Sequence, residues 1–323
     1  MTELDEGWIK ERIARFSNIR VPDRLEIITD TTEFMGICRG QVLSVGDARF
    51  LVTGNIYESR FGLSDEPKYW VKKAIDLETG AQQIIKMVYY EEFQVRVGSL
   101  RIRCYRKPRK ETQVLELVRG NPYFMQGRGL FDKRGNEVRA VDYIRGKNLY
   151  NLIYLESKLS HEEYFHTVFP GFFRNLIECF AAIGFLHDNG LCHGDIRNDH
   201  ILIDQETGVY RWIDFDLMQD FSDFDVWSLG NVLQFCAGMG MITFHDVFRS
   251  ESFTEAAKRN LTSDDASAFY EHRIMNLQKL FPYIPDSLND VLLHFALNTA
   301  IFYESVDQVV DDMKKTLQDL PLV

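Results

Sequence analysis

The 323-residue sequence predicts an α+β fold with a small β-rich N-terminal lobe and a larger helical C-terminal lobe. Two observations predict it. Between about residues 24 and 100, short apolar runs rich in Val, Ile and aromatic residues are separated by turn sequences, which is typical of strands. Beyond residue 150 the apolar residues recur at helical spacing in long segments. The chain is long enough for both lobes to bury a core.

Composition and charge restrict the function classes. Apolar residues make up 45% and charged residues 26%, as in ordinary soluble domains. The net charge of −11 argues against nucleic acid as the main partner, because phosphates would be repelled. Five scattered cysteines without a CxxC pair predict reduced thiols and a cytoplasmic location. No apolar run reaches membrane-spanning length, and the acidic N-terminus is unlike a signal peptide.

The N-terminal half is expected to begin with an amphipathic helix over residues 4–16, whose Trp8 would pack on the body of the protein or serve a partner. The sequence LETG at residues 77–80 predicts a hairpin turn between two strands. Residues 101–110 contain six basic residues in ten. We interpret this run as a solvated approach to the next helix, with a docking patch for an acidic partner as the alternative.

Several helices are predicted beyond this basic run. The sequence KETQVLELVRG at residues 110–120 predicts a helix that ends at Gly120. In the C-terminal half, three segments show helical spacing, and two of them are closed by Gly. They are FFRNLIECFAAIGFLHDNG at 172–190, DVWSLGNVLQFCAG at 225–238, and SVDQVVDDMKKTLQDL at 305–320.

The most informative stretch is LCHGDIRNDHILID, residues 191–204. A polar loop leads there into a short strand, and a second strand, VYRWID, ends at Asp214. A tight turn between the two strands brings Asp195, His200 and Asp214 to one end of a hairpin. Two carboxylates at such a point suit a divalent cation and a general base. Aspartates are also common in turns, so a polar turn without chemistry remains the alternative.

Over roughly residues 49–318 the motifs resemble, in order, those of the protein-kinase fold. AQQIIKMV (81–88) is similar to the third kinase strand and places Lys86 at the phosphate-contacting lysine. KETQVLELV (110–118) is similar to the αC helix, with Glu111 as the ion-pair partner of Lys86. AVDYIRGKNL (140–149) resembles the hinge that binds the adenine edge.

The second half of the resemblance lies in the C-terminal lobe. HGDIRNDHILID stands where kinases have H-R-D-L-K-x-x-N, and IDFDL stands where they have D-F-G. DFDVWSLG resembles the αF helix, whose acid, here Asp225, would brace the catalytic loop. The resemblance implies a bilobal protein-kinase-like fold. The expected divisions are an N-terminal extension at 1–48, a kinase N-lobe at 49–145 and a C-lobe at 146–323.

The resemblance also implies roles for individual residues. Lys86 would hold the α and β phosphates of ATP, with Glu111 fixing its side chain. Asp214 would ligate Mg²⁺, and Asp195 would accept the proton of the attacking hydroxyl. Arg197 would reach the γ-phosphate. The remaining expected nucleotide contacts are Gly54, Val71, Val141, Asp142, Tyr143, Ile144 and Leu202.

His200 departs from the kinase pattern because it occupies the position of the metal-binding Asn. Imidazole suits Mn²⁺ and later metals better than Mg²⁺. We expect His200 either to ligate the second cation or to hydrogen-bond Asp195, with a packed histidine beside a weakened metal site as the alternative. The catalytic loop resembles that of bacterial lipopolysaccharide core kinases, which carry His at the matching place.

Other departures concern regulation. Gly194 replaces the Arg that binds an activation-loop phosphate in many kinases. Only eight residues, Leu217 to Phe224, separate DFD from Asp225, which is too short for an ordinary activation segment. Phe302 stands near the place of the late Arg that usually pairs with that segment. Together these departures predict an enzyme that is not switched on by activation-loop phosphorylation and has an open substrate groove.

Three departures concern nucleotide binding. The Gly-rich loop keeps Gly54 and Gly62 but lacks the G-x-G-x-x-G spacing. Ile84 replaces the small Ala that usually touches adenine and would crowd the base. Asp216 replaces the Gly of D-F-G, which would restrict flipping of the segment. The loop and Ile84 keep a pseudokinase acting as a binding module among the alternatives.

The function predicted from these residues is an ATP-dependent kinase that uses Mg²⁺ or Mn²⁺ and transfers the γ-phosphate to a hydroxyl. The sequence resembles bacterial serine/threonine protein kinases, so a protein hydroxyl is the first candidate acceptor. A small molecule, sugar or lipid acceptor is the second. Nucleotidyl transfer on the same fold is a third option. The expected partners are ATP and the hydroxyl substrate, without nucleic acid or a membrane span.

Overall fold

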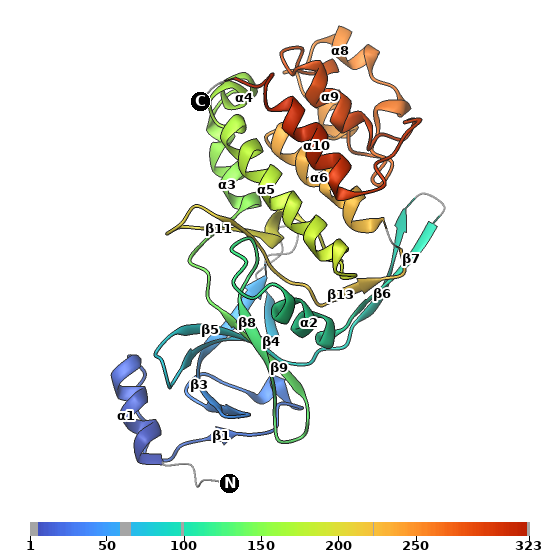
Figure 1. Cartoon of the computed structure of the whole chain (residues 1–323). Helices are drawn as coiled ribbons and strands as arrows, with labels where there is room; N and C mark the ends of the chain where they lie inside the picture. The colour runs from blue at the N-terminus through green and yellow to red at the C-terminus, as the bar shows by residue number, and fades with distance from the viewer. Residues whose placement is uncertain (1–5, 59–65, 98–99, 222, 322–323) are drawn as a thin grey trace. The chain divides into compact units, whose positions relative to one another are not determined.

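The computed structural model describes residues 6–58, 66–97, 100–221 and 223–321. The chain forms two compact units, which we describe separately. Unit 1 consists of Met1–Glu91, Lys107–Asn121 and Met125–Ile144, and unit 2 consists of Glu92–Arg106, Pro122–Phe124 and Arg145–Val323. The observed architecture is α+β, with a sheet-rich first unit and a mainly helical second one (Figure 1). The sequence-based limits at residues 48 and 145 stay a prediction.

Unit 1 contains a seven-stranded sheet in the order β1-β2-β3-β4-β5-β9-β8. Its strands are β1 (Ile27–Ile28), β2 (Val42–Val45), β3 (Ala48–Glu58), β4 (Glu66–Asp76), β5 (Gln82–Lys86), β8 (Gly127–Phe131) and β9 (Glu137–Asp142). β1 pairs parallel with β2, and all other pairs are antiparallel. The predicted turn at LETG is confirmed, because it joins β4 to β5.

Both faces of this sheet carry apolar residues, because successive side chains of a strand point to opposite sides. One face packs a buried cluster that includes Phe50, Ala74 and Ile85. The other face is covered in part by helix α1 (Glu6–Phe16), whose buried Ile9 and Ile13 form a cluster with sheet residues. Trp8 packs against that cluster, which confirms packing on the body of the protein as its role.

Helix α2 (Pro108–Leu117) completes unit 1 and packs on β8 and β9. Proline at the first helical position favours this start, because the missing N–H has no partner there in any helix. Glu111 lies in the first turn, where a carboxylate is stabilised by the helix dipole. Gly120, with φ of 79°, turns the chain away beyond the helix end. The predicted helix is confirmed with shifted bounds, because it begins two residues earlier and ends at Leu117 instead of Gly120.

Unit 2 is built mainly from helices, and the three segments predicted from their spacing are confirmed as α5, α6 and α10. The helices of the unit are α3 (Leu149–Leu155), α4 (His161–Thr167), α5 (Phe169–Asp188), α6 (Phe224–Ala237), α7 (Phe244–Arg249), α8 (Glu255–Asn260), α9 (Asp286–Leu293) and α10 (Val306–Thr316). α5 contacts α4, α6 and α10, so it forms the centre of the helical core.

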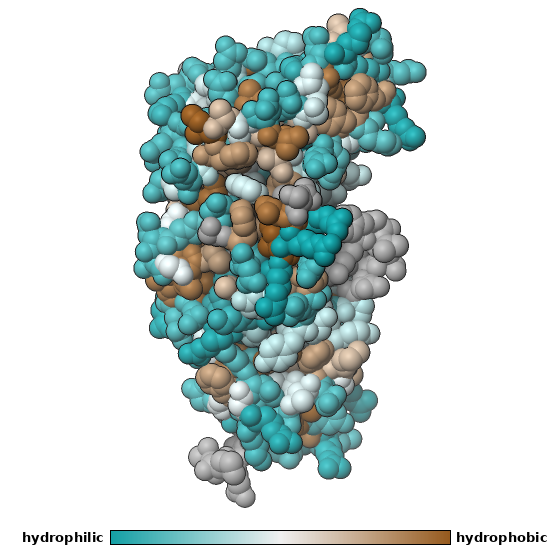
Figure 2. Space-filling view, turned by 90° about the vertical axis from the view of Figure 1, so that its right-hand side faces the viewer, coloured by the Kyte–Doolittle hydropathy of each residue, from teal (hydrophilic) through white to brown (hydrophobic). Residues whose placement is uncertain are grey.

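α5 is long and apolar enough to cross a membrane by length and composition alone, contrary to the expectation from the sequence. However, 61% of its apolar window is buried inside the protein, which is the pattern of a core helix. On the face shown in Figure 2, hydrophobic residues form separate small patches among hydrophilic ones. The absence of a membrane span stays a prediction.

Two small sheets belong to unit 2. The first has the order β10-β11-β12 and comprises Gly146–Asn148, Ile201–Asp204 and Tyr210–Trp212. The second has the order β13-β7-β6 and comprises Leu217–Gln219, Leu100–Arg106 and Glu92–Val97. The interpretation of the basic run at 101–110 as an approach to a helix is therefore wrong for residues 101–106, whereas residues 107–110 do lead into helix α2. Residues 101–106 lie in strand β7, where Ile102 and Cys104 are buried, Arg101 is exposed, and Arg103 and Arg106 form ion pairs.

Candidate active site

In unit 1, Lys86 and Glu111 form the ion pair that the sequence predicted. Lys86 Nζ lies 2.5 Å from Glu111 Oε1, and both side chains are buried. A third residue completes the cluster, because Arg139 Nε donates to Glu111 Oε2 at 3.0 Å. Lys86 and Arg139 face each other across β5 and β9, so they share one side of the sheet.

Two cations therefore contact the carboxylate of Glu111. Burial of charged groups is costly unless they are paired, so Arg139 helps to keep Glu111 ionised and in place. Arg139 was missed by the sequence reasoning, although its position opposite Lys86 follows once β5 and β9 are paired.

The same side of β5 carries Ile84, two residues before Lys86. Ile84 pairs with Val141 of β9, and Lys86 pairs with Val71 of β4. Because paired residues share a face, these apolar side chains lie beside the lysine. The expected contacts Val71 and Val141 are thus brought together with Lys86 in unit 1. Ile84 lies on the same face, which is where a side chain must lie if it is to crowd the adenine base.

The predicted hinge residues end strand β9. The amide of Asp142 donates to Gln126 O at 2.8 Å, and that of Tyr143 donates to Gln82 O at 3.2 Å. The backbone amides of Asp142 and Tyr143, two of the expected nucleotide contacts, are therefore engaged within the unit. Gly54 lies in β3 beside a register shift, whereas Gly62 and the rest of the predicted loop at 59–65 lie outside the described residues.

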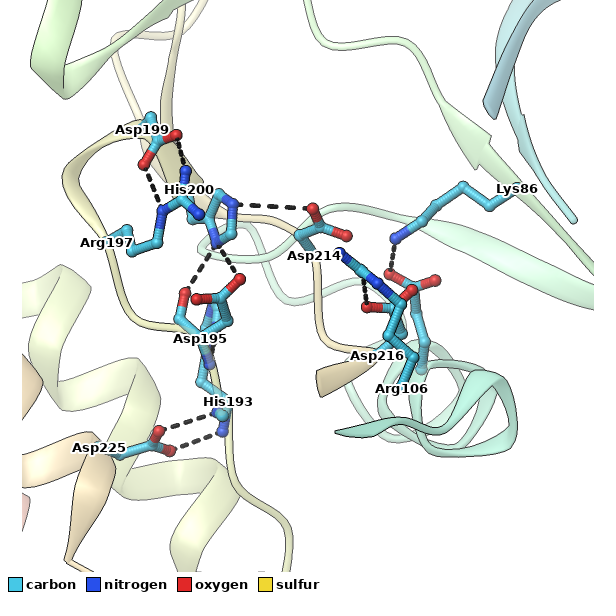
Figure 3. A network of polar contacts seen from close by, with 12 residues as sticks. Lys86, Arg106, His193, Asp195, Arg197, Asp199, His200, Asp214, Asp216 and Asp225 are labelled. Atoms are coloured by element: carbon cyan, nitrogen blue, oxygen red, sulfur yellow. Dashed lines mark hydrogen bonds and ion pairs between the residues drawn. The ribbon is translucent and has the colours of Figure 1, made fainter. Parts of the chain in front are cut away.

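In unit 2, the acid of helix α6 holds the catalytic loop, as predicted. Asp225 accepts backbone hydrogen bonds from His193 N at 2.6 Å and from Gly194 N at 2.8 Å (Figure 3). It also lies 3.0 Å from His187 Nε2 at the end of α5. Gly194 has φ of 87°, so the loop uses a conformation that glycine adopts without strain.

The three residues expected at the hairpin end are also brought together. His200 Nδ1 donates to the backbone carbonyl of Asp195 at 2.7 Å. Its Nε2 faces Asp214 Oδ2 at 3.7 Å, and Nδ1 lies 3.6 Å from Asp195 Oδ2. In the neutral ring the proton is thus on Nδ1, and the Nε2 lone pair points toward the Asp214 carboxylate. Both proposed roles of His200 are compatible with this placement.

The two carboxylates of this group differ in environment. Burial raises the pKa of Asp195, and the nearby Asp214 raises it further, while His200 and Arg197 oppose the shift. A raised pKa is what a proton acceptor for an alcohol needs. Asp214 has φ of 70°, a left-handed conformation that is rare for Asp and is common at functional sites.

Arg197 does not extend freely from the loop. Its Nε donates to Asp199 Oδ1 at 2.9 Å, and a second guanidinium nitrogen donates to Asp199 Oδ2. Burial works against the charge of Asp199, but Arg197 and His200 outweigh it and lower the pKa of that carboxyl. Asp199 was missed by the sequence reasoning, and a phosphate would compete with it for Arg197.

Asp216, which replaces the Gly of D-F-G, forms a buried ion pair. Its Oδ1 accepts from Arg106 NH1 at 2.6 Å, and Arg106 belongs to strand β7. The sequence reasoning attributed to Asp216 only a loss of backbone freedom. The partner of Asp216, Arg106, lies 110 positions earlier in the chain and was not predicted.

A divalent cation fits the donor set at Asp214 and His200. His200 is held as histidine ligands usually are, because its other ring N–H donates to the backbone carbonyl of Asp195. Within the part of the chain that the structure describes, no group of three or more His, Cys, Asp or Glu is arranged to hold a metal ion. Further ligands would come from phosphate oxygens and water, as is usual for Mg²⁺.

The structure resembles solved kinase domains. It matches the crystal structure of the Mycobacterium tuberculosis PknI kinase domain with a TM-score of 0.51, covering 87% of this chain and 100% of that domain at 12% identity. The fold is protein-kinase-like. No protein-family profile matches the chain.

Two curated proteins are similar in sequence. A probable serine/threonine-protein kinase KIN1 homolog of Encephalitozoon cuniculi (strain GB-M1) is 23% identical over 199 residues, covering 53% of this chain and 33% of the relative. NUAK family SNF1-like kinase 1 of Mus musculus is 24% identical over 147 residues, covering 46% of this chain and 20% of the relative. The chain spans a third or less of the length of either.

Proposed function

We propose that the protein is an ATP-dependent phosphotransferase that transfers the γ-phosphate to a serine or threonine hydroxyl of a protein. The observation that carries this proposal is the group formed by Asp195, His200 and Asp214, held from α6 by Asp225. The kinase-like fold and the names of the two similar proteins support the same reaction class. Neither similarity identifies the substrate.

Each unit contributes its own residues to the proposed reaction. Lys86, supported by Glu111 and Arg139, would bind the α and β phosphates as a buried cation. Asp195 would orient the attacking hydroxyl and accept its proton. Leu202 of β11 and Val71 of β4 would contact the base, and Ile144 would supply the hinge amide that Asp142 and Tyr143 do not.

A divalent cation bound with ATP would neutralise charge on the phosphates. Asp214 and His200 would hold it, and the nitrogen ligand favours Mn²⁺ over Mg²⁺. Arg197 would leave Asp199 to contact the γ-phosphate, since both partners lie at the loop surface.

A small-molecule, sugar or lipid acceptor is the second candidate. The observation that favours it is the short connection between Asp216 and α6, because a peptide substrate usually docks on a longer segment. The same connection suggests that no phosphorylation there is needed for activity. The free cysteines fit the proposed cytoplasmic location.

The test uses purified protein with γ-labelled and α-labelled ATP, each with Mg²⁺ or Mn²⁺, beside Asp195→Ala. The control is Asp311→Ala on the exposed face of α10. Transfer of γ label should fall by about 10²–10⁴-fold in Asp195→Ala and stay unchanged in the control. Equal inactivity of wild type and Asp195→Ala, with ATP still raising the melting temperature, would identify a binding module instead. Transfer of α label would indicate nucleotidyl transfer.

A further inference from the structure

A hairpin inserted before helix α2 pairs with the segment that follows Asp214. Strands β6 and β7 form this hairpin, and β7 pairs antiparallel with β13. The register places Leu217 opposite Arg106 and Gln219 opposite Cys104. The residues directly after the DFD sequence are therefore held as the edge of a three-stranded sheet (Figure 1).

An apolar cluster fixes the hairpin on the helical core of unit 2. Ile102 and Cys104 of β7 are buried together with Leu217, Phe224 and Phe269. Because Leu217 and Phe224 flank the connection to α6, the cluster holds both of its ends. The hairpin is thus an integral part of the packing around this connection.

The polar contact at the start of β13 is the ion pair between Arg106 and Asp216. Their side chains are only 10% and 3% exposed, and the N–O distance is 2.6 Å. Asp216 lies two residues after Asp214, whose left-handed conformation persists only where its surroundings determine it. Arg106 supplies a charged, directional contact at that point. Figure 3 shows Arg106 reaching Asp216 beside Asp214.

We propose that Arg106 is a positioning residue, which holds Asp216 and thereby keeps Asp214 in its metal-binding conformation without phosphorylation. This inference rests on the proposed function and extends it to regulation. In many kinases an added phosphate orders the segment after D-F-G through an arginine. Here an aspartate encoded in the chain takes the place of that phosphate, and the arginine comes from the inserted hairpin.

The ion pair with Arg106 explains why Asp216 stands at the position of the Gly in the kinase D-F-G pattern. Glycine at residue 216 would give the backbone more freedom and would remove the carboxylate of the buried ion pair. Asp216→Gly would therefore lower the free energy of unfolding, although it restores the D-F-G sequence of kinases. A purely conformational role for residue 216 predicts the opposite result.

The experiment measures Mn²⁺ binding by electron paramagnetic resonance in the presence of a non-hydrolysable ATP analogue. Arg106→Met should raise the dissociation constant of Mn²⁺ by about 10–100-fold, the usual effect of losing support behind a metal ligand. Arg106→Lys, which keeps the charge, should recover part of the affinity. Arg103→Met is the matched control, because Arg103 lies on the same strand in an exposed pair with Glu92. It should bind Mn²⁺ as the wild type does.

The double variant Arg106→Met/Asp216→Leu separates positioning from stability. Apolar replacement of a buried ion pair commonly preserves folding, so its melting temperature should be close to that of the wild type. Its Mn²⁺ affinity should nevertheless stay low. Recovery of Mn²⁺ affinity together with the melting temperature would overturn the proposal, and so would unchanged affinity in Arg106→Met.

Failure of the proposed function is distinguishable from failure of this inference. The proposed function fails if the wild type binds Mn²⁺ and the ATP analogue but transfers no phosphate. The inference about Arg106 fails if the wild type and Arg106→Met bind Mn²⁺ equally well. A wild type that binds no Mn²⁺ with the analogue overturns both.

Discussion

His200 donates from Nδ1 to the backbone carbonyl of Asp195 at 2.7 Å, so the opposite side of its ring faces the carboxylate of Asp214. A histidine held in this way directs its second ring nitrogen toward a carboxylate oxygen. That combination is typical of a ligand pair for a transition-metal cation. The contact also ties the position of the candidate ligand to the backbone of the proposed proton acceptor.

Replacing His200 should change the metal preference. In His200→Asn an amide oxygen takes the place of the ring nitrogen, so the ratio of activity with Mn²⁺ to activity with Mg²⁺ should fall several-fold. The measurement is γ-label transfer across titrations of both cations. His245→Asn, an exposed histidine of α7, is the control. An unchanged ratio in His200→Asn would exclude the ligand role.

Replacing Asp225 should disorder the catalytic loop. In Asp225→Asn one of the two acceptor oxygens becomes an N–H₂ group facing donors of the loop or of His187. Leaving such buried donors without acceptors should cost about 2–4 kcal/mol of unfolding free energy and lower kcat. Urea denaturation and label transfer measure the two effects. Asp311→Asn should change neither, and equal behaviour of both variants would contradict the bracing role.

Arg139 should contribute to stability through Glu111. Arg139→Met removes a cation that is 1% exposed and whose Nε lies 3.0 Å from Glu111 Oε2. Breaking part of a buried cluster should cost about 3 kcal/mol in urea denaturation. Arg109→Met is the control, because Arg109 forms an exposed pair with Glu137 and should cost less than about 1 kcal/mol. Similar losses in the two variants would argue against a cooperative cluster.

Stability should fall as the pH drops from about 6.5 to about 4. His161 stacks on Phe281, contacts Ala237 O and the Tyr283 hydroxyl, and burial lowers its pKa to about 4 despite the Ala237 hydrogen bond. In this window the unfolded histidine binds a proton and the folded one does not, so unfolding takes up a proton. The loss should reach about 2–3 kcal/mol at pH 4.

The variant His161→Phe keeps the stacking on Phe281 and removes the titrating group. Its unfolding free energy should vary less with pH between 6.5 and 4, as measured by urea denaturation at a series of pH values. His166→Phe, at an exposed position of the same helix, should keep the slope of the wild type. A variant at His161 with an unchanged slope would assign the pH dependence to other groups.

The residues that the sequence predicted correctly lie in short motifs. Asp195, His200 and Asp214 are joined by a hairpin, and local spacing places them together. Their long-range supports were not predicted, because nothing near Arg106 in the sequence identifies Asp216 as its partner. Strand β7 was not predicted, because the run was interpreted from its charges. The alternation of arginine with Ile102 and Cys104 nevertheless has the period of a strand. Arg139 was hidden for a similar reason, since its role depends on the pairing of β5 with β9.

The pairing of β7 with β13 has a consequence for how the chain is made. Arg106 leaves the ribosome 110 residues before Asp216, so the apolar side of the hairpin has no cover while the helical half is being translated. Neither compact unit is a continuous stretch of chain, and a fragment cut at residue 145 would separate the hairpin from the residues with which it folds. Recombinant pieces of this protein should therefore aggregate, and nascent chains should depend on chaperones until α6 has been synthesised.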